Sequence, residues 1–141
     1  MNGLISGVLL RGRRKSERSV HLNEQIKGEK MSSTGSEIVG AQALPLSGLV
    51  NYQEASVVSR VILKRDKGNV TLFAFDEGQC LSEHTSPFDA LVQGIEGNAE
   101  VTVAGKPIAL KSGQVILLPA ERPHAVKAIT RFKMALTMIR S

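Results

Sequence analysis

The 141-residue chain contains a single cysteine, Cys80, no tryptophan, and only 4% aromatic residues. One cysteine excludes an internal disulfide, which fits a reducing compartment such as the cytoplasm. With so few aromatic rings, we expect the core to be built from Val, Ile, Leu, Ala and Met. A chain of this length holds one ordinary domain with a real core and is too short for two.

Long hydrophobic runs are also missing, since none approaches the ~20 residues that a helix needs to cross a bilayer. At the start of the chain, the mildly apolar residues 1–10 precede a basic cluster that begins at Arg11. A secretory signal has the opposite order, with the basic residues first. We therefore expect a cytoplasmic protein with no membrane partner.

The excess of positive charge is confined to the beginning of the chain. The net charge is +5, of which residues 1–30 carry +4 and residues 31–141 carry +1. The basic cluster is not interleaved with aromatic side chains that would stack on bases, so we predict no nucleic-acid partner. A basic tail that binds an acidic surface is the alternative interpretation of residues 1–30.

Residues 1–40 show no sustained period of 2 or 3.6, and their Gly, Ser and charge content predicts a disordered leader. Residues 41–141 are predicted to form the folded domain. Met31 is an alternative start, because residues 27–30 can be encoded by a purine-rich run that resembles a bacterial ribosome-binding site. Residues 1–30 would then be an over-extended gene prediction or an inessential tail.

From residue 57 onward, short segments rich in β-branched residues alternate with Gly and Pro signals. Such a pattern, with a turn signal about every ten residues, predicts an all-β sandwich or barrel. Residues 44–56 leave open an extended arm or one short helical turn. Strands are predicted at residues 57–63, 70–75, 79–85, 90–95, 99–104, 107–110, 115–118, 125–129 and 132–139.

Several of these strands are apolar on both faces, for example the one that contains Leu91 and Val92 and the one at 115–118. In a closed barrel one face fills the interior and the other meets water, so apolar residues on both faces indicate that the outside is covered as well. A second subunit is the simplest cover. We therefore predict a homodimer.

One stretch of the chain resembles the first motif of the cupins, G-x5-H-x-H-x(3–4)-E-x6-G. Gly78, His84, Pro87, Asp89 and Gly97 follow one another in the order of that motif. The second cupin motif, G-x5-P-x-G-x2-H-x3-N, is matched in spacing further along the chain by Gly113, Pro119 and His124.

The resemblance is to small single-domain cupins of the cupin 2, conserved β-barrel type. It implies an all-β fold, namely a double-stranded β-helix (jelly-roll) barrel, with residues 1–40 as a disordered or extended N-terminal segment. It also implies a site inside the barrel and is in keeping with a dimer, because many cupins are dimeric.

The resemblance also implies metal-ligand positions, of which only His84 and His124 are kept. Ser86 stands where the motif has its second His, Ala90 where it has Glu, and Ala128 where it has the trailing Asn. Catalytic Zn or Fe(II) sites normally have three protein ligands, so we expect two imidazoles to hold a divalent ion weakly, if at all. The candidate cofactors are Fe, Ni, Zn and Mn.

Neighbouring side chains are not expected to replace the lost ligands. Period-2 alternation places Cys80 and Ser82 on the face of His84, but Cys80 lies ~13 Å from it, too far to share an ion. We expect Cys80 to be a buried small hydrophobe, with a redox-active thiol as the alternative. The same alternation turns Glu83 and Asp89 away from the interior, and we expect Glu121 at a solvated rim.

We predict a pocket lined by His84, Ser86, Ala90, His124 and Met134 that binds a small polar or acidic organic molecule. Core filler is the alternative role for the thioether of Met134. The second hypothesis is a metal-dependent cupin enzyme of the oxygenase, isomerase or decarboxylase class, or a metal-free enzyme that uses one His as general base. The third is an interaction module that acts through its dimer face. Fold resemblance does not name a substrate.

Overall fold

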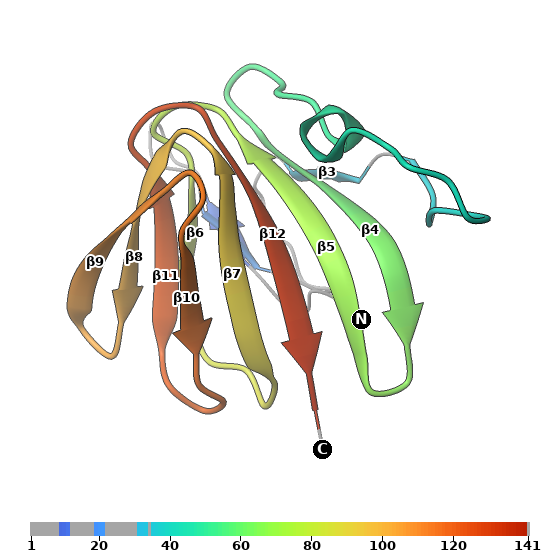
Figure 1. The fold of residues 1–141 in the computed structure, drawn as a ribbon. Coiled ribbons are helices and arrows are strands. Elements are labelled where there is room, and N and C mark those ends of the chain that lie inside the picture. Colours follow the sequence, from blue (N-terminus) through green and yellow to red (C-terminus); the bar gives the residue numbers. More distant parts are fainter. Residues whose placement is uncertain (1–8, 12–18, 22–30, 34, 141) are drawn as a thin grey trace.

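Two six-stranded sheets face each other in the computed structural model, which describes residues 9–11, 19–21, 31–33 and 35–140 (Figure 1). The first sheet has the order β2-β1-β6-β11-β8-β9, and the second has the order β10-β7-β12-β5-β4-β3. From β5 to β12 the chain changes sheet at every connection except the hairpin that joins β8 to β9. The predicted double-stranded β-helix is thereby confirmed.

The strands lie close to where the sequence places them. Their bounds, together with those of one short 3-10 helix, are β1 (Leu9–Arg11), β2 (Ser19–His21), β3 (Met31–Ser33), η1 (Leu46–Leu49), β4 (Val57–Arg65), β5 (Gly68–Phe75), β6 (Cys80–His84), β7 (Asp89–Glu96), β8 (Asn98–Val103), β9 (Lys106–Lys111), β10 (Val115–Leu118), β11 (His124–Ala128) and β12 (Phe132–Ile139). Within the described residues, no helix combines the length and apolar character needed to span a membrane.

The main core lies between the two sheets and includes three phenylalanine rings. Phe73 and Phe75 project from the same face of β5, and their ring centroids are 6.1 Å apart. The ring of Phe132, at the start of β12, lies 5.7 Å from that of Phe75. All three side chains are fully buried, and together they fill one end of the barrel, called here the phenylalanine end.

A second, smaller core covers the outer face of the second sheet. Leu72 and Ala74, on the outward face of β5, are fully buried beneath residues that surround η1, among them Val50 and Tyr52. Because this segment of the chain covers its own sheet, no second subunit is needed there. The segment 44–56 contains one short helical turn, which resolves the choice that the sequence left open.

Polar contacts fasten this covering segment to the barrel. The Tyr52 hydroxyl donates a 2.7 Å hydrogen bond to Glu96 Oε1, and Lys133 Nζ donates one of the same length to Ser47 O. Lys133 Nζ also lies 4.8 Å from the centroid of the Tyr52 ring, within the range of a cation–π contact. Burial and the neighbouring Glu96 both raise the pKa of Tyr52, so its hydroxyl keeps its proton.

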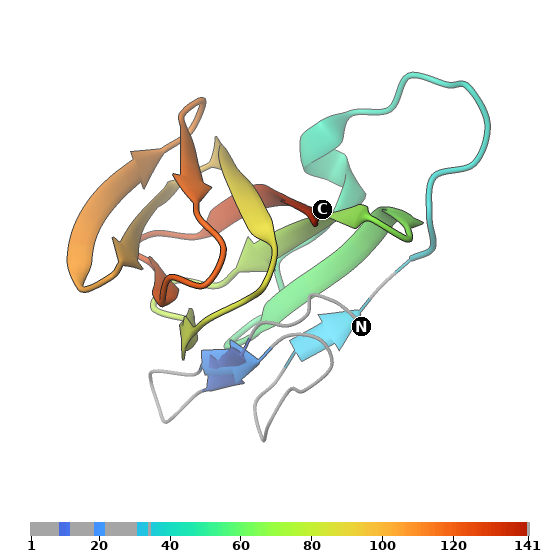
Figure 2. The same ribbon diagram turned by 90° about the horizontal axis from the view of Figure 1, so that it is seen from below.

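Three short strands lie within the segment that the sequence assigns to a disordered leader. β1 pairs with β6 and β2, and β3 pairs in parallel with β4 (Figure 2). Residues 35–40 are also described, and the amide of Ile38 donates to the carbonyl of Ile62. The rest of the disorder prediction, at residues 1–8, 12–18, 22–30 and 34, lies outside the described residues.

Two glycines of the first motif have backbone conformations that other residues rarely adopt. Gly97 has a φ of +80°, and a Cβ there would collide with the carbonyl oxygen of Arg131. Gly78 has a φ of +83°, and its amide donates to the carbonyl of Ala128. The motif spacing therefore marks turns that shape the barrel, which explains why it predicts the fold.

Candidate functional site

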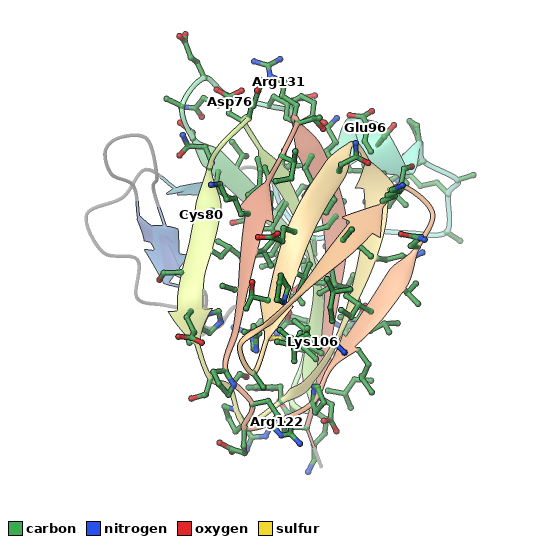
Figure 3. All side chains as sticks on the ribbon, turned by 90° about the vertical axis from the view of Figure 1, so that its left-hand side faces the viewer. Asp76, Cys80, Glu96, Lys106, Arg122 and Arg131 are labelled. Atoms are coloured by element: carbon green, nitrogen blue, oxygen red, sulfur yellow. The ribbon has the colours of Figure 1, made fainter. Side chains whose placement is uncertain are left out.

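The two motif histidines lie side by side on neighbouring strands of the first sheet. His84 ends β6, His124 begins β11, and the two residues are direct partners in the antiparallel register. Their ring centroids are 4.5 Å apart, with the ring planes at 66° in an edge-to-face arrangement. Arg122, two residues before His124, marks this histidine end of the barrel in Figure 3, opposite Asp76 and Arg131.

A β-bulge in β6 turns His84 toward the interior. Leu81 is the partner of Val126, and His84 is the partner of His124, so the strand gains one residue opposite Ala125. Leu81 and Val126 belong to the main core. The extra residue lets both Leu81 and His84 face inward, although they are three positions apart and regular alternation would place them on opposite faces.

The bulge corrects the expected position of Cys80. Regular alternation puts Cys80 on the face of His84, but the structure pairs it with the exposed Lys127, on the outer face of the sheet. Cys80 is partly buried there rather than fully buried. The thiol therefore does not share the inward face of the sheet with the two histidines.

Hydrogen bonds to backbone carbonyls fix the tautomer of both rings. His84 Nδ1 lies 2.8 Å from Ser82 O, and His124 Nδ1 lies 3.1 Å from Arg122 O. Because a carbonyl oxygen only accepts, each Nδ1 must donate, and each neutral ring carries its lone pair on Nε2. The same arrangement is found in histidines that bind metal ions through Nε2.

The environment of His124 favours the neutral ring. Its side chain is only 7% exposed, and this burial lowers its pKa below the usual range for histidine. The hydrogen bond to the Arg122 carbonyl and the negative charge of Glu83 act in the opposite direction without cancelling the effect. His124 is thus neutral near pH 7 and offers a lone pair rather than a positive charge.

Ser86 and Ala90 lie beside the histidine end in different roles. The amide of Phe88 donates a 3.1 Å hydrogen bond to Ser86 Oγ, so this hydroxyl shapes the turn before β7. The carbonyl of Ser86 accepts from the amide of Glu121 at 2.7 Å, which joins the two loops at this end. Ala90 is buried in the main core, where its small side chain leaves room next to Met138.

Met134 is not brought to the level of the histidines. It pairs with Phe73 and Gly94, whereas Met138 is the partner of Ala90. The two methionines are four positions apart along the strand, which corresponds to about 13 Å between their Cα atoms. Met138 therefore takes the position at the histidine end, and Met134 fills the core beside the phenylalanines. The sequence pattern alone does not distinguish them.

The nearby carboxylates of Asp89 and Glu121 are not placed to act as further metal ligands beside the histidines. Asp89 Oδ1 accepts a 2.9 Å hydrogen bond from the amide of Ala120, which fixes the loop before His124. Glu121 is exposed, as expected for a rim position, and it adopts a φ of +65° where the family motif has glycine. Among the residues that the structure describes, no group of three or more His, Cys, Asp or Glu is placed to hold a metal ion.

The described donor set therefore does not fit a tightly held catalytic metal ion. His84 and His124 supply two imidazoles, one ligand fewer than catalytic zinc sites usually take from the protein. The Nδ1 hydrogen bonds would suit a weakly held ion, with the remaining positions filled by water or by a ligand.

Two buried polar side chains on the second sheet, opposite the histidines, are not predicted from the sequence. Asn69, the β5 partner of Met138, and Thr71 both face the interior and are buried. Thr71 Oγ1 donates a 3.1 Å hydrogen bond to Asn69 Oδ1. The amide group of Asn69 thus lies at the histidine end of the core. Its only signal in the sequence is a polar residue in phase with the buried face of a strand.

Comparisons with known proteins agree with this architecture. A family model described as a cupin domain matches residues 71–140. A conserved protein of unknown function from Streptococcus pyogenes is 33% identical, with a TM-score of 0.71 over 75% of this chain and 93% of that one. A cupin superfamily protein from Desulfitobacterium hafniense is 28% identical, with a TM-score of 0.71 over 75% and 97%.

A further similar structure is a cupin 2 conserved barrel domain protein from Leptotrichia buccalis. It is 36% identical, with a TM-score of 0.65, over 67% of this chain and 46% of that one. A search of curated proteins finds no match. The names of these three proteins specify no ligand and no reaction.

Proposed function

The chain belongs to the cupin family, and on that basis we propose that it is a small-molecule binding barrel whose ligand contacts the imidazoles of His84 and His124. The observation that carries the proposal is the matched geometry of the two rings. Each is held by a backbone carbonyl at Nδ1 and has its lone pair on Nε2. Two acceptors this close together suit a ligand that donates hydrogen bonds from hydroxyl or amino groups.

The opposite wall suits the carbon skeleton of such a ligand. Leu118, Ala90 and Met138 form one row across β10, β7 and β12, and all three belong to the main core. Asn69 continues the row on β5 and adds an amide. A few placed polar groups facing an apolar wall are typical of sites for small organic molecules.

A screen of small polar compounds by thermal shift tests the proposal. We expect stabilisation by at least one compound, and loss of that stabilisation in His84→Gln and His124→Gln. Cys80→Ser, on the outer face of β6, is the matched control and should respond like the wild type. Compounds that stabilise both histidine variants as well as they stabilise the wild type would contradict binding at this pocket.

The second candidate function is a metal-dependent cupin enzyme with two protein ligands, and the Nδ1 hydrogen bonds of the two rings favour it. Elemental analysis of protein purified without chelators tests this alternative. Stoichiometric Fe, Ni, Zn or Mn that is lost in His84→Ala/His124→Ala would favour the enzyme. A metal-free and fully folded protein that still binds ligand would favour the binding barrel.

We also propose that a second copy of the chain covers part of the second sheet. Beyond the reach of the segment around η1, Leu91, Val115 and Leu117 are 39%, 56% and 58% exposed. Leu91 and Leu117 are direct partners on β7 and β10, so they form a continuous apolar surface at the sheet edge. Apolar surface of this kind is a common feature of subunit interfaces.

A further inference from the structure

Cross-strand register places Lys106 in line with the histidine pair. Lys106, the first residue of β9, pairs with Val103 on β8. Val103 pairs in turn with His124 on β11, and His124 pairs with His84 on β6. Residues directly opposite each other in antiparallel strands project from the same face of the sheet. His84, His124, Val103 and Lys106 therefore form one row across the inner wall of the barrel.

The rest of β9 confirms which way this row faces. Ile108 is the partner of Val101, and Leu110 is the partner of Ala99. Leu110 is only 2% exposed, and it packs in the main core together with Val101 and Ala99. Lys106 alternates in phase with Ile108 and Leu110, so its side chain leaves the strand on the inward side, at the edge of the histidine end.

The spacing would let a small molecule lie across the side chain of Val103, which stands between the lysine and the imidazoles in this row. Neighbouring strands lie about 4.8 Å apart, so the Cα atoms of Lys106 and His124 are separated by about 10 Å. The flexible four-carbon stem of lysine covers part of that distance and carries a compact ammonium group at its tip. A ligand of a few heavy atoms can therefore contact the ammonium and the Nε2 atoms at once.

The other charged side chains described at this end have other partners or lie outside this row. Asp89 is bound to the amide of Ala120, and the Arg140 guanidinium lies 5.7 Å from the centroid of the Phe88 ring. Glu83 acts on His124 through its negative charge, while Glu121 and Arg122 lie in the loop between β10 and β11, outside the row of paired residues. Among the cations that the structure describes at this end, Lys106 is the one that the register places in that row.

We propose that Lys106 binds a carboxylate of the ligand and that the ligand is a small hydroxycarboxylic acid; this inference rests on the proposed function. A neutral imidazole with its lone pair on Nε2 accepts a hydrogen bond from a hydroxyl but not from a carboxylate, which has no proton to donate. The ammonium of Lys106 donates to a carboxylate in a charge-assisted hydrogen bond. The imidazoles would thus bind a hydroxyl group and Lys106 a carboxylate of the same small molecule.

Three compounds with the same three-carbon skeleton test this assignment. Lactate carries both the hydroxyl and the carboxylate, propanoate lacks the hydroxyl, and propane-1,2-diol lacks the carboxylate. Binding is measured by titration while the imidazole ¹⁵N signals are followed. We expect lactate to bind at least about tenfold more tightly than either of the other two compounds, because each of them loses one hydrogen bond to a polar wall group.

Lys106→Gln is the key variant, and Lys111→Gln is its matched control. Both lysines lie on β9 and are exposed, but Lys111 is five residues away and projects from the opposite face. We expect Lys106→Gln to weaken lactate binding about tenfold or more while leaving the diol unaffected. Lys111→Gln should bind all three compounds like the wild type.

The outcomes separate this inference from the proposed function. If Lys106→Gln keeps full affinity for lactate while His84→Ala or His124→Ala loses it, the pocket stands and the role of Lys106 is overturned. Equal weakening by Lys111→Gln would also overturn that role, because it would show a general effect of charge. If lactate leaves the imidazole signals of the wild type unchanged, the hydroxy-acid assignment is overturned, and the compound screen decides separately whether the pocket binds other molecules.

Discussion

The imidazole rings of His84 and His124 are each held by the carbonyl oxygen of the residue two positions earlier in the chain, that of Ser82 and that of Arg122 respectively. Nearby backbone therefore orients both rings, through β6 for His84 and through the loop before β11 for His124, and their centroids are 4.5 Å apart. Because backbone carbonyls fix the orientation of both rings, the pair needs no ligand to adopt this geometry. Such pre-organisation reduces the entropy that is lost on binding.

The bulge in β6 predicts that alanine substitutions at two adjacent residues differ in their cost to stability. Leu81 is 3% exposed in the main core, so Leu81→Ala should lower the free energy of unfolding by about 2–5 kcal/mol. Cys80 lies on the outer face, and Cys80→Ala should cost less than about 1 kcal/mol. Urea unfolding of the two variants measures both values. A larger cost for Cys80 than for Leu81 would show that β6 has no bulge.

Glu121 stands in a conformation that costs free energy. Its φ of +65° is disfavoured for any residue with a Cβ and is accessible to glycine. Glu121→Gly should therefore stabilise the protein by about 1 kcal/mol, as measured by urea unfolding. Arg122→Gly, at the next position, lacks this benefit and is expected to be neutral or destabilising. A destabilised Glu121→Gly would mean that the Glu121 side chain makes a contact that outweighs the strain.

Asp76 predicts a loss of stability in acid. Burial raises the pKa of its carboxyl, but hydrogen bonds from the Ala55 amide (2.6 Å) and from Arg131 Nε (2.9 Å), among others, outweigh burial and lower the pKa below the usual value. The ionised carboxylate therefore stabilises the fold above the unfolded-state pKa of about 3.9, and this contribution disappears as the pH falls through the lowered value.

Asp76→Asn separates this contribution from the rest of the acid response. We expect the variant to be less stable than the wild type at pH 7 and to lose less stability between about pH 5 and pH 2. Thermal unfolding over this pH range measures the difference. If the two proteins lose stability in parallel as the pH falls, the hydrogen bonds to Asp76 do not contribute as described.

Much of the fold can be predicted from the sequence because glycine turns and alternating strands are local features. The alternation in 70–75 places Phe73 and Phe75 in the core, and the motif spacing places His84 and His124 together in one end of the barrel. The position of Cys80 is predicted wrongly, because a bulge shifts the face of every residue before it. Nothing in the local pattern indicates that one residue of 82–83 is extra.

Contacts between distant segments account for what the sequence does not predict. The outer face of β5 is apolar, which indicates a cover, yet the cover is the segment around Val50 and Tyr52 rather than another subunit. Likewise, Lys106 joins the row of His124 only through the pairing of β8 with β9 and β11. Register of this kind depends on the assembled sheet, and a single strand pattern does not contain it.

The exposed apolar surface on β7 and β10 predicts a dimer that one charge should weaken. Leu117 is 58% exposed and lies directly opposite Leu91. Leu117→Glu would bury a carboxylate in the interface, so we expect it to raise the dimer dissociation constant at least about tenfold. Light scattering at low micromolar concentration measures the mass of the wild type and of the variant.

Ile129 provides the matched control for this substitution. It is 50% exposed, at the turn between β11 and β12, away from the surface formed by Leu91, Val115 and Leu117. Ile129→Glu should leave the mass unchanged. A wild-type protein that is monomeric at this concentration, or a dimer that survives Leu117→Glu, would exclude this surface as the interface.

The central claim, that His84 and His124 form one ligand-binding pocket, is tested most directly by long-range ¹H–¹⁵N spectra of the imidazole rings at a pH well above their titration. The spectra are recorded during titration with a compound that stabilises the protein. We predict that both rings are protonated at Nδ1 and that both Nε2 signals shift together along one binding curve. A ring protonated at Nε2, or a bound compound that moves neither Nε2 signal, would contradict the account.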